Sequence, residues 1–174
     1  VGFGQTFVVG DRTAQVTNTN IKDDDPSAGG ADLTAGDGIS FQGNVTVAGG
    51  IGVQVDPILN GLNFTVENGV TISSQDQGFL VGEVPVPFVL PTGDFDGDIT
   101  NLGTISSSAS SAVFFNSSFS GSFLNSGTIS VGNLPGPSLL PNAAVVLLSD
   151  VTGRFVNTGT IQGMDFSDGV FIFG

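Results

Sequence analysis

A five-residue motif, Asn-x-Gly-Thr-Ile, occurs three times in the C-terminal half of the chain, at residues 101–105, 125–129 and 157–161. Each copy follows the same lead-in, which has a glycine four residues before the asparagine and an apolar residue two before it. A unit that returns every few tens of residues is typical of solenoid proteins, in which successive turns of the chain stack on one another. The repeat therefore constrains the fold strongly, although it contains no residue type that indicates a chemical reaction.

The spacing of the repeats predicts the length of one coil. The shortest interval runs from Asn101 to Asn125, and the interval from Asn125 to Asn157 is longer by eight positions. The additional residues fall at 131–142, where three prolines prevent continued strand pairing. An earlier copy at 68–72 is also separated from Asn101 by a longer interval, and this excess falls in a second proline-rich stretch. We therefore expect coils of about 24 residues, interrupted by extruded loops at 74–92 and 131–142.

The alternation of side chains along a strand predicts which residues of the motif face inward. Residues two apart share one side of a strand, so each asparagine should point inward with the apolar residue before it. Stacked asparagine amides can pair with one another, and the following glycine is expected to supply the positive φ of a tight corner. In the earliest copy the glycine directly follows the asparagine, and Phe64 stands in place of the lead-in glycine. The predicted corner ladder consists of Asn68, Asn101, Asn125 and Asn157 with Gly103, Gly127 and Gly159.

The remaining sequence favours strands over helices. Gly, Ser, Thr, Asn and Asp are frequent, and no apolar spacing of three and four residues occurs. Short β-branched and Phe-rich runs separated by turn residues predict strands instead. We predict an all-β fold, a single-stranded parallel β-helix of about six or seven coils, right-handed and continuous over 1–174. The first coils, at 1–60, are atypical, whereas 61–174 carries the clear repeats.

The composition excludes several classes of partner. Sixteen acidic and three basic residues give a formal net charge of −13. Nucleic acid is excluded because so few basic residues cannot neutralise phosphates, and an anionic membrane surface is excluded for the same reason. There is no signal-peptide pattern and no run of 18 apolar residues, so we expect no membrane insertion by this segment. Because the chain starts and stops within strand-like patterns, we expect a fragment or processed segment of a longer protein.

One acidic run is a candidate metal site. Asp94, Asp96 and Asp98 alternate at the spacing that calcium loops use, and 23–25 adds three consecutive aspartates. The rest of the twelve-residue calcium-loop pattern is missing, and aspartate is also favoured at turns. Two hypotheses follow for Asp94, Asp96 and Asp98: a calcium site, or a solvated acidic corner.

The sequence indicates that the chain is not an enzyme. Glycan lyases with a β-helical fold need a basic residue near the abstracted proton, and glycan hydrolases need paired carboxylates. The chain has no His and only one Lys and two Arg, and it lacks the Trp and Tyr platforms that bind sugars. The Thr-Ile-Ser triplets also place hydroxyls outward in rows. Such rows can bind ice, but the β-propensity of threonine explains them equally well.

The segments 112–115 and 121–130 resemble the passenger-domain repeats of bacterial autotransporters and related large β-helical surface adhesins. The resemblance covers 97–174 well and 37–75 loosely. It implies an extracellular or bacterial cell-surface location and an adhesin-like scaffold that contacts a host or matrix glycan or protein.

An alternative function is a self-assembling extracellular filament or surface-layer subunit. Stacked coils leave unpaired strand edges at their ends, and 171–174 offers no polar cap. Other copies of the chain would then stack coil on coil or exchange strands, with calcium as a possible aid.

Overall fold

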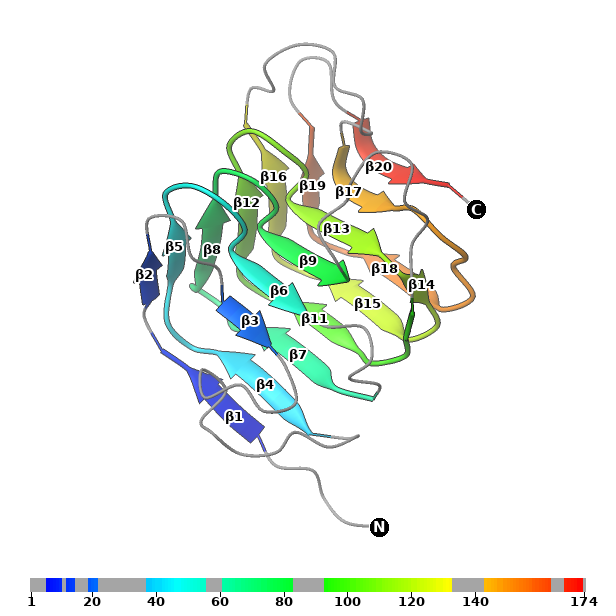
Figure 1. The fold of residues 1–174 in the computed structure, drawn as a ribbon, viewed down its shortest axis with the longest axis horizontal. Helices are drawn as coiled ribbons and strands as arrows, with labels where there is room; N and C mark the ends of the chain where they lie inside the picture. Colours follow the sequence, from blue (N-terminus) through cyan, green and yellow to red (C-terminus); the bar gives the residue numbers. More distant parts are fainter. Residues whose placement is uncertain are drawn as a thin grey trace.

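The computed structural model describes residues 6–10, 12–14, 19–21, 37–55, 61–82, 93–132, 143–163 and 168–173. Within these ranges every regular element is a β-strand, and no helix occurs. The strands pair in parallel into three six-stranded sheets, which extend through the molecule from β1–β3 at one end to β18–β20 at the other (Figure 1). The prediction of an all-β fold built from stacked parallel strands is therefore confirmed, and the arrangement is consistent with a β-helix.

The chain visits the three sheets in a constant order, so each sheet collects every third main strand. Sheet 1 contains β1 (Thr6–Val9), β4 (Gly38–Phe41), β7 (Asn63–Val66), β11 (Ile99–Asn101), β15 (Ser122–Asn125) and β18 (Arg154–Asn157). Sheet 2 contains β2 (Arg12–Ala14), β5 (Val45–Val47), β8 (Thr71–Ser74), β12 (Thr104–Ser107), β16 (Thr128–Val131) and β19 (Thr160–Gln162). Sheet 3 contains β3 (Thr19–Ile21), β6 (Val53–Val55), β9 (Phe79–Gly82), β13 (Val113–Asn116), β17 (Ala143–Leu147) and β20 (Asp168–Ile172).

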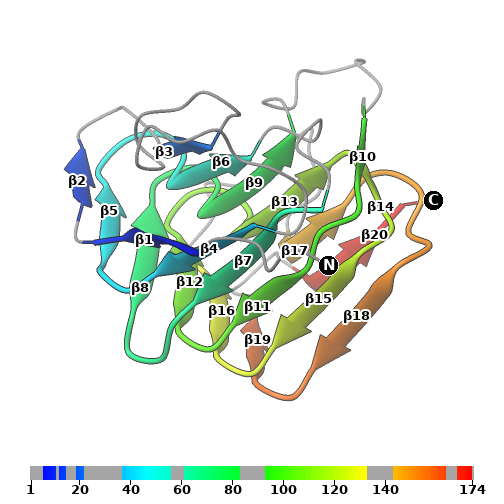
Figure 2. The ribbon, with the colours of Figure 1, turned by 90° about the horizontal axis from the view of Figure 1, so that it is seen from below.

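A short fourth column connects sheet 3 back to sheet 1 in the later part of the chain. It consists of β10 (Asp94–Phe95) paired with β14 (Ser118–Phe119), and Val151 continues it through a bridge to Phe119. Figure 2 shows the sheets from a second direction, with β10 and β14 on the side where β11 and β15 begin. The atypical strands within 6–55 join the same three sheets as the strands after residue 61.

The burial of the strands follows the alternation of their side chains. In sheets 1 and 2 the strands of the middle of the stack alternate between buried and partly exposed residues, as expected when one face of a sheet covers the core. In sheet 3, β9, β13 and β17 are buried on both faces. Outward side chains of these strands form a second apolar cluster together with Ile51, which precedes β6; the strands contribute Leu80, Phe114, Ala143 and Val146.

One continuous apolar interior connects all three sheets. It includes residues from Val9 in the first strand to Val145 and Leu147 in β17, with Phe155 packed against it in β18. Phenylalanine rings form a chain of contacts along this interior, with centroid separations from 4.8 Å for Phe115 and Phe119 to 6.5 Å. Such ring pairs stabilise a core beyond the burial of their area. The rings therefore link successive strands along the direction of stacking.

A first insertion lies between β9 and β11. Phe79 pairs with Val113 in sheet 3, and Ile99 pairs with Phe123 in sheet 1. The chain therefore takes twice as many residues from Phe79 to Ile99 as from Val113 to Phe123. The excess equals the length of 83–92, which lies outside the described residues.

The predicted loop at 74–92 is wrong over its first part. Ser74 is still part of β8, and Phe79–Gly82 forms β9 with all four residues buried. The repeat spacing alone does not reveal this strand, because its Phe-Leu-Val-Gly sequence runs directly into the proline-rich stretch. Residues 83–92 of the predicted loop lie outside the described residues.

A second insertion lies between β16 and β17. Thr128 pairs with Thr104 in sheet 2, whereas Val145 pairs with Val113 in sheet 3, an interval that is longer by eight positions. All of the additional residues therefore enter between these two strands, although Val131, the first residue of the predicted loop at 131–142, is still part of β16. Of that loop, 133–142 lies outside the described residues.

Candidate functional site

The asparagines of the three repeats form a column in sheet 1. Asn101 pairs in register with Asn125, and Asn125 with Asn157. The Asn101 Nδ2 donates to the Asn125 Oδ1 at 2.7 Å, and the Asn125 Nδ2 donates to the Asn157 Oδ1 at 2.7 Å. The Asn101 Nδ2 also donates to the Thr128 oxygen in β16, and the Asn125 Nδ2 donates to the Thr160 oxygen in β19, both at 3.2 Å. Asn101 and Asn125 are fully buried, in agreement with the parity of the strand.

The fourth predicted member, Asn68, does not belong to this column. The residue in register with Asn101 is Val66, and Asn68 is exposed in a turn. The corner between β7 and β8 contains four residues, 67–70, whereas the next corner contains only Leu102 and Gly103. The two extra residues carry Asn68 out of the strand, so the parity rule no longer applies to it.

The prediction that Phe64 takes the place of the lead-in glycine in the earliest copy is also wrong. Because Phe64 pairs with Ile99, it is an ordinary inward residue of β7. The residue that lies against Gly97 is Leu62, since a Cβ on Gly97 would be 1.8 Å from the Leu62 carbonyl oxygen. The same two-residue shift explains this error.

The corner glycines are required for close approach of two backbones, and their φ angles are not positive. A Cβ on Gly127 would lie 2.0 Å from the carbonyl oxygen of Gly103, and one on Gly159 would lie 2.1 Å from that of Gly127. Our expectation of a left-handed corner was therefore wrong. Stacked corners meet backbone to backbone, and only glycine leaves enough room. The lead-in glycines Gly121 and Gly153 stack in the same way, since a Cβ added to Gly121 would lie 1.9 Å from the Gly97 oxygen and one added to Gly153 would lie 2.1 Å from the Gly121 oxygen.

The asparagine column begins with an unsatisfied atom. The Asn101 Oδ1 is buried and has no hydrogen-bond partner. Asn125 and Asn157 each accept from the preceding asparagine, but Asn101 follows Val66, which has no donor in its side chain. The column thus changes from apolar to polar residues between β7 and β11.

The carboxylates of the acidic run each accept hydrogen bonds from a neighbouring part of the chain. The Asp98 Oδ1 accepts from the Ser122 amide at 2.9 Å, and the Asp96 Oδ1 accepts from the Gly61 amide. The carboxylate of Asp94 accepts from the Ser120 hydroxyl at 3.2 and 3.3 Å. No group of three or more potential ligands among the described residues could hold a metal ion. Asp94 and Asp98 thus bind the two sides of the turn between β14 and β15, whereas Asp96 binds the segment that precedes β7. The aspartates at 23–25 lie outside the described residues.

The predicted rows of outward hydroxyls are present on sheet 2. Thr71, Thr104, Thr128 and Thr160 are in register, and so are Ser73, Ser106, Ser130 and Gln162. These residues are partly or fully exposed. The face is therefore polar and regular, which is also the ordinary result of threonine and serine on the solvent side of a strand.

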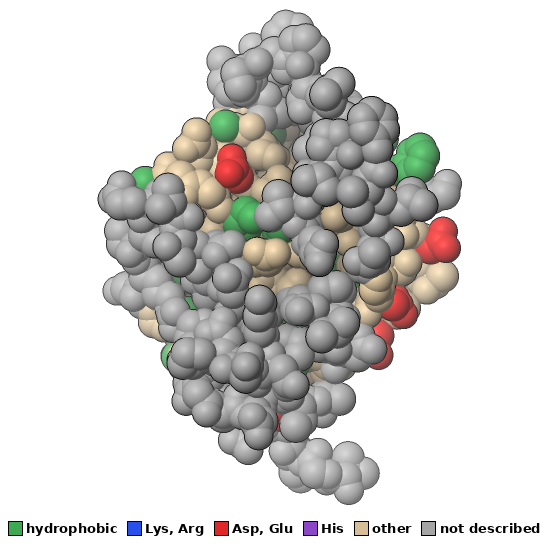
Figure 3. Space-filling model, in the orientation of Figure 1, with side chains coloured by type: hydrophobic (Ala, Val, Ile, Leu, Met, Phe, Trp, Pro, Cys, Tyr) green, Lys and Arg blue, Asp and Glu red, His purple; other side chains and the backbone are tan. Residues whose placement is uncertain are grey.

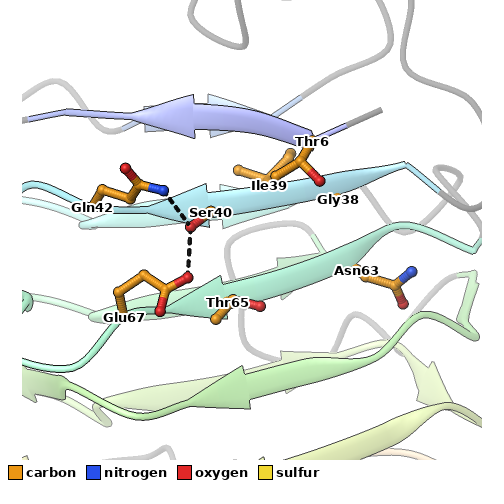
Figure 4. Close-up of a pocket in the computed structure, with 8 residues that line it drawn as sticks. All are labelled: Thr6, Gly38, Ile39, Ser40, Gln42, Asn63, Thr65 and Glu67. Atoms are coloured by element: carbon orange, nitrogen blue, oxygen red, sulfur yellow. Dashed lines mark hydrogen bonds between the residues drawn. The ribbon is translucent and has the colours of Figure 1, made fainter. Parts of the chain in front are cut away.

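A shallow polar depression lies on the outer face of sheet 1 (Figure 4). Its volume is about 370 Å³, and among its lining residues the Ser40 hydroxyl donates to the Glu67 Oε1 at 2.9 Å. The Gln42 Nε2 donates to the same hydroxyl at 3.4 Å. No sequence motif indicated this site, because its residues come from strands of the atypical first part and from β7. Its lining residues are Thr6, Gly38, Ile39, Ser40, Gln42, Asn63, Thr65 and Glu67.

The end of the stack at β18–β20 differs from its middle. Inward-facing residues of these last strands remain accessible, with Val170 39 % and Ile172 56 % exposed, and Phe173 is 66 % exposed. Phe155 stacks on Phe123 at 5.1 Å with its ring plane tilted by only 6°. The other face of this ring points along the stack to the open end. Acidic side chains gather at one edge of the face shown in Figure 3, where no basic side chain of the described residues is visible.

Comparison with known proteins gives no match to a family model, a curated protein or a solved structure. Across the part of the chain that the structure describes, no helix is long and apolar enough to cross a membrane.

Proposed function

We propose that the chain is a closed, right-handed β-helix of six coils that serves as a rigid scaffold in a secreted or cell-surface bacterial protein. The observation that carries this proposal is the single apolar interior shared by three parallel sheets whose strands recur in constant order. Adjacent coils bury each other along their whole length, so a displacement of one coil is transmitted to its neighbours. This continuity suits a spacer that holds binding segments at a fixed distance.

The surface of the described residues supports a structural function. The carboxylates of the acidic corner are engaged with turn backbone and a hydroxyl, and the depression on sheet 1 contains one carboxylate, Glu67. Two carboxylates on opposite sides of a bond are what glycan hydrolysis needs. We therefore propose a non-enzymatic, adhesin-like scaffold. The segments inserted between β9 and β11 and between β16 and β17 are proposed to contact a glycan or matrix protein.

Hydrogen exchange tests the architecture. If the six coils form one cooperative unit, the amides of β4, β9 and β16 should exchange with similar, slow rates, because all of them open only in global unfolding. Fast exchange of a whole sheet beside slow exchange of the other two would contradict a closed β-helix.

Surface labelling tests the location and the binding function. Antibodies raised against the chain should label intact source cells, and a glycan and matrix-protein array should show a ligand. That signal should disappear when 133–142 is replaced by a short Gly-Ser linker while the melting temperature is retained. Labelling of permeabilised cells alone would contradict a surface location, and release of reducing sugar from glycans would contradict the non-enzymatic function.

Self-assembly is the second candidate function. It is favoured by the accessible inward residues at the β18–β20 end, since an unpaired strand edge with apolar side chains is a template for further pairing. Light scattering and negative-stain microscopy over a range of protein and calcium concentrations distinguish the two functions. Filaments support self-assembly, and a monomer at all concentrations supports the scaffold.

A further inference from the structure

The asparagine column has a direction. Asn101 donates to Asn125 and Asn125 donates to Asn157, so every Nδ2 points to the next coil and every Oδ1 to the previous one. At the last strand of sheet 1, the Asn157 Nδ2 donates only to the oxygen of its own corner residue Gly159, at 3.3 Å. Its counterpart in Asn125 makes the 2.7 Å and 3.2 Å bonds to the following coil in addition to a 3.4 Å bond to its own corner. The open end therefore presents an amide donor that is used elsewhere to bind the next coil.

The backbone at this end has the same direction. In the inner coils, inward residues donate their amides to the following coil, as Phe64 does to the Asp98 oxygen and Phe79 to the Ala112 oxygen, both at 2.8 Å. The equivalent residues of β18 are Phe155 and Asn157. By this register their amides lie on the free edge of sheet 1.

The two ends of the column do not match each other. At the other end the corresponding residue is Val9, which pairs in register with Phe41 and is only 1 % exposed. A second copy stacked head to tail would place Val9 against Asn157, and the amide would lose its partner in a buried position. Two copies meeting at their β18 strands would bring two Nδ2 donors together, which also leaves them unpaired.

We propose that the open end at β18–β20 receives a further coil with asparagine in register with Asn157, and that this end selects such a coil over a second copy of the chain. The proposal rests on the β-helical scaffold proposed above. The partner is a strand-forming segment of the Asn-x-Gly-Thr-Ile type, which adds to the edge of the sheet by backbone pairing. The asparagine supplies the acceptor for the Asn157 Nδ2, and it continues the column in the same direction.

Discrimination between partners depends on the polar pair. A site built to bond a polar group rejects a partner that leaves this group unpaired.

The test uses the full chain with a copy of the 121–130 sequence attached after Gly174 through a flexible Gly-Ser linker. The linker keeps the segment at high effective concentration. A matched form has valine in place of the asparagine of the attached segment, and both forms are also made with Asn157→Val. Hydrogen exchange of the Phe155 and Asn157 amides reports binding of the segment in all four proteins.

We expect the asparagine segment to slow exchange of both amides, about tenfold more than the valine segment does. In the Asn157→Val background this preference should vanish or reverse. The two segments differ only outside the native chain, so their comparison holds even if Asn157→Val lowers stability. Equal protection by both segments, or no protection by either, overturns the proposal. Protection that rises with concentration in the unextended chain overturns it in favour of a second copy.

Failure of the scaffold itself would have a different signature. In that case the amides of Phe64 and Phe79 would exchange rapidly in the unextended chain. If these amides are protected and the four proteins show no preference, the scaffold stands and only the selectivity is refuted.

Discussion

Asn101 and Val66 lie opposite each other in neighbouring strands of sheet 1, and the buried Oδ1 of Asn101 has no hydrogen-bond partner. A buried polar atom without a partner costs about 1–3 kcal/mol. The boundary between the apolar and the polar part of the column is therefore a weak point of the interior. It is also a place where a polar substitution can form a new bond.

Val66→Asn is expected to cost less than the same substitution at Val53, which is equally buried in sheet 3. The new Nδ2 would lie where Asn101 offers its free Oδ1, so the bond offsets roughly 1 kcal/mol of the loss. At Val53 no such acceptor column exists, because its partner is Phe79. Urea unfolding of both variants measures the difference. Equal losses of unfolding free energy at the two positions would show that no hydrogen bond forms to the Asn101 Oδ1.

Asn125→Val should destabilise the chain by about 2–4 kcal/mol. The substitution removes the acceptor of the Asn101 Nδ2 and the donor to the Asn157 Oδ1, both at 2.7 Å. The neighbouring exposed residue is a suitable control, and Ser126→Ala should cost less than about 0.5 kcal/mol. Chemical denaturation measures the free energy of unfolding of both variants. A loss for Asn125→Val no greater than that of the control would mean that the ladder contributes nothing to stability.

Gly127→Ala should be among the most damaging substitutions of a single methyl group in this chain. The added Cβ would lie 2.0 Å from the Gly103 backbone oxygen. No side-chain rotation can relieve this overlap, because the position of a Cβ is fixed by its own backbone. We expect a loss of about 3 kcal/mol or more. Gly10→Ala is the control, because a Cβ there has no atom within 4 Å. A melting temperature for Gly127→Ala close to that of Gly10→Ala would refute the close contact of the corners.

Phe115→Ala should cost about 3–5 kcal/mol, since this ring is fully buried between Phe119 at 4.8 Å and Phe123 at 6.0 Å. Phe173→Ala removes the same atoms from a side chain that is 66 % exposed, so its effect on unfolding should be small. Calorimetry or guanidinium unfolding gives both values. Similar losses would indicate that Phe173 is covered in solution, which would itself point to assembly at that end.

Asp98 separates the structural and the metal-binding hypotheses for the acidic corner. Asp98→Asn keeps an oxygen for the Ser122 amide, so stability should change little, whereas Asp98→Ala should cost up to about 1 kcal/mol. Calcium should not raise the melting temperature of the native chain or of either variant. A calcium-dependent rise that Asp98→Asn abolishes would restore the calcium hypothesis.

The parallel stacking could be predicted because the motif recurs along the chain. The inward asparagines could be predicted because side chains alternate between the two sides of a strand. Asn101 and Asn125 follow that rule without exception. Asn68 does not, since two extra residues in one corner place it outside the strand, where the parity rule no longer applies, while the spacing to Thr71 and Ile72 stays intact. Counting from the isoleucine of sheet 2 back to Phe64 would have revealed the shift.

Other features depend on contacts that no sequence pattern records. The function of Gly127 follows from the approach of the preceding corner at Gly103, so the residue type alone suggests the wrong cause. β9 could not be predicted from alternation of apolar and polar residues, because all four of its residues, on both faces, are buried. The depression at Ser40 and Glu67 joins residues 27 positions apart in a region where the repeat is weak.

The two insertions have a consequence for how such a chain can change. Ten and eight residues enter between sheets, yet the strands on either side keep the same partners. Length at these junctions is therefore decoupled from pairing, and a segment can be exchanged there without shifting any strand by the single step that would turn its core side chains to solvent. Sequence diversity can therefore accumulate in the segments inserted at these junctions, while the residues of the interior stay under strict selection.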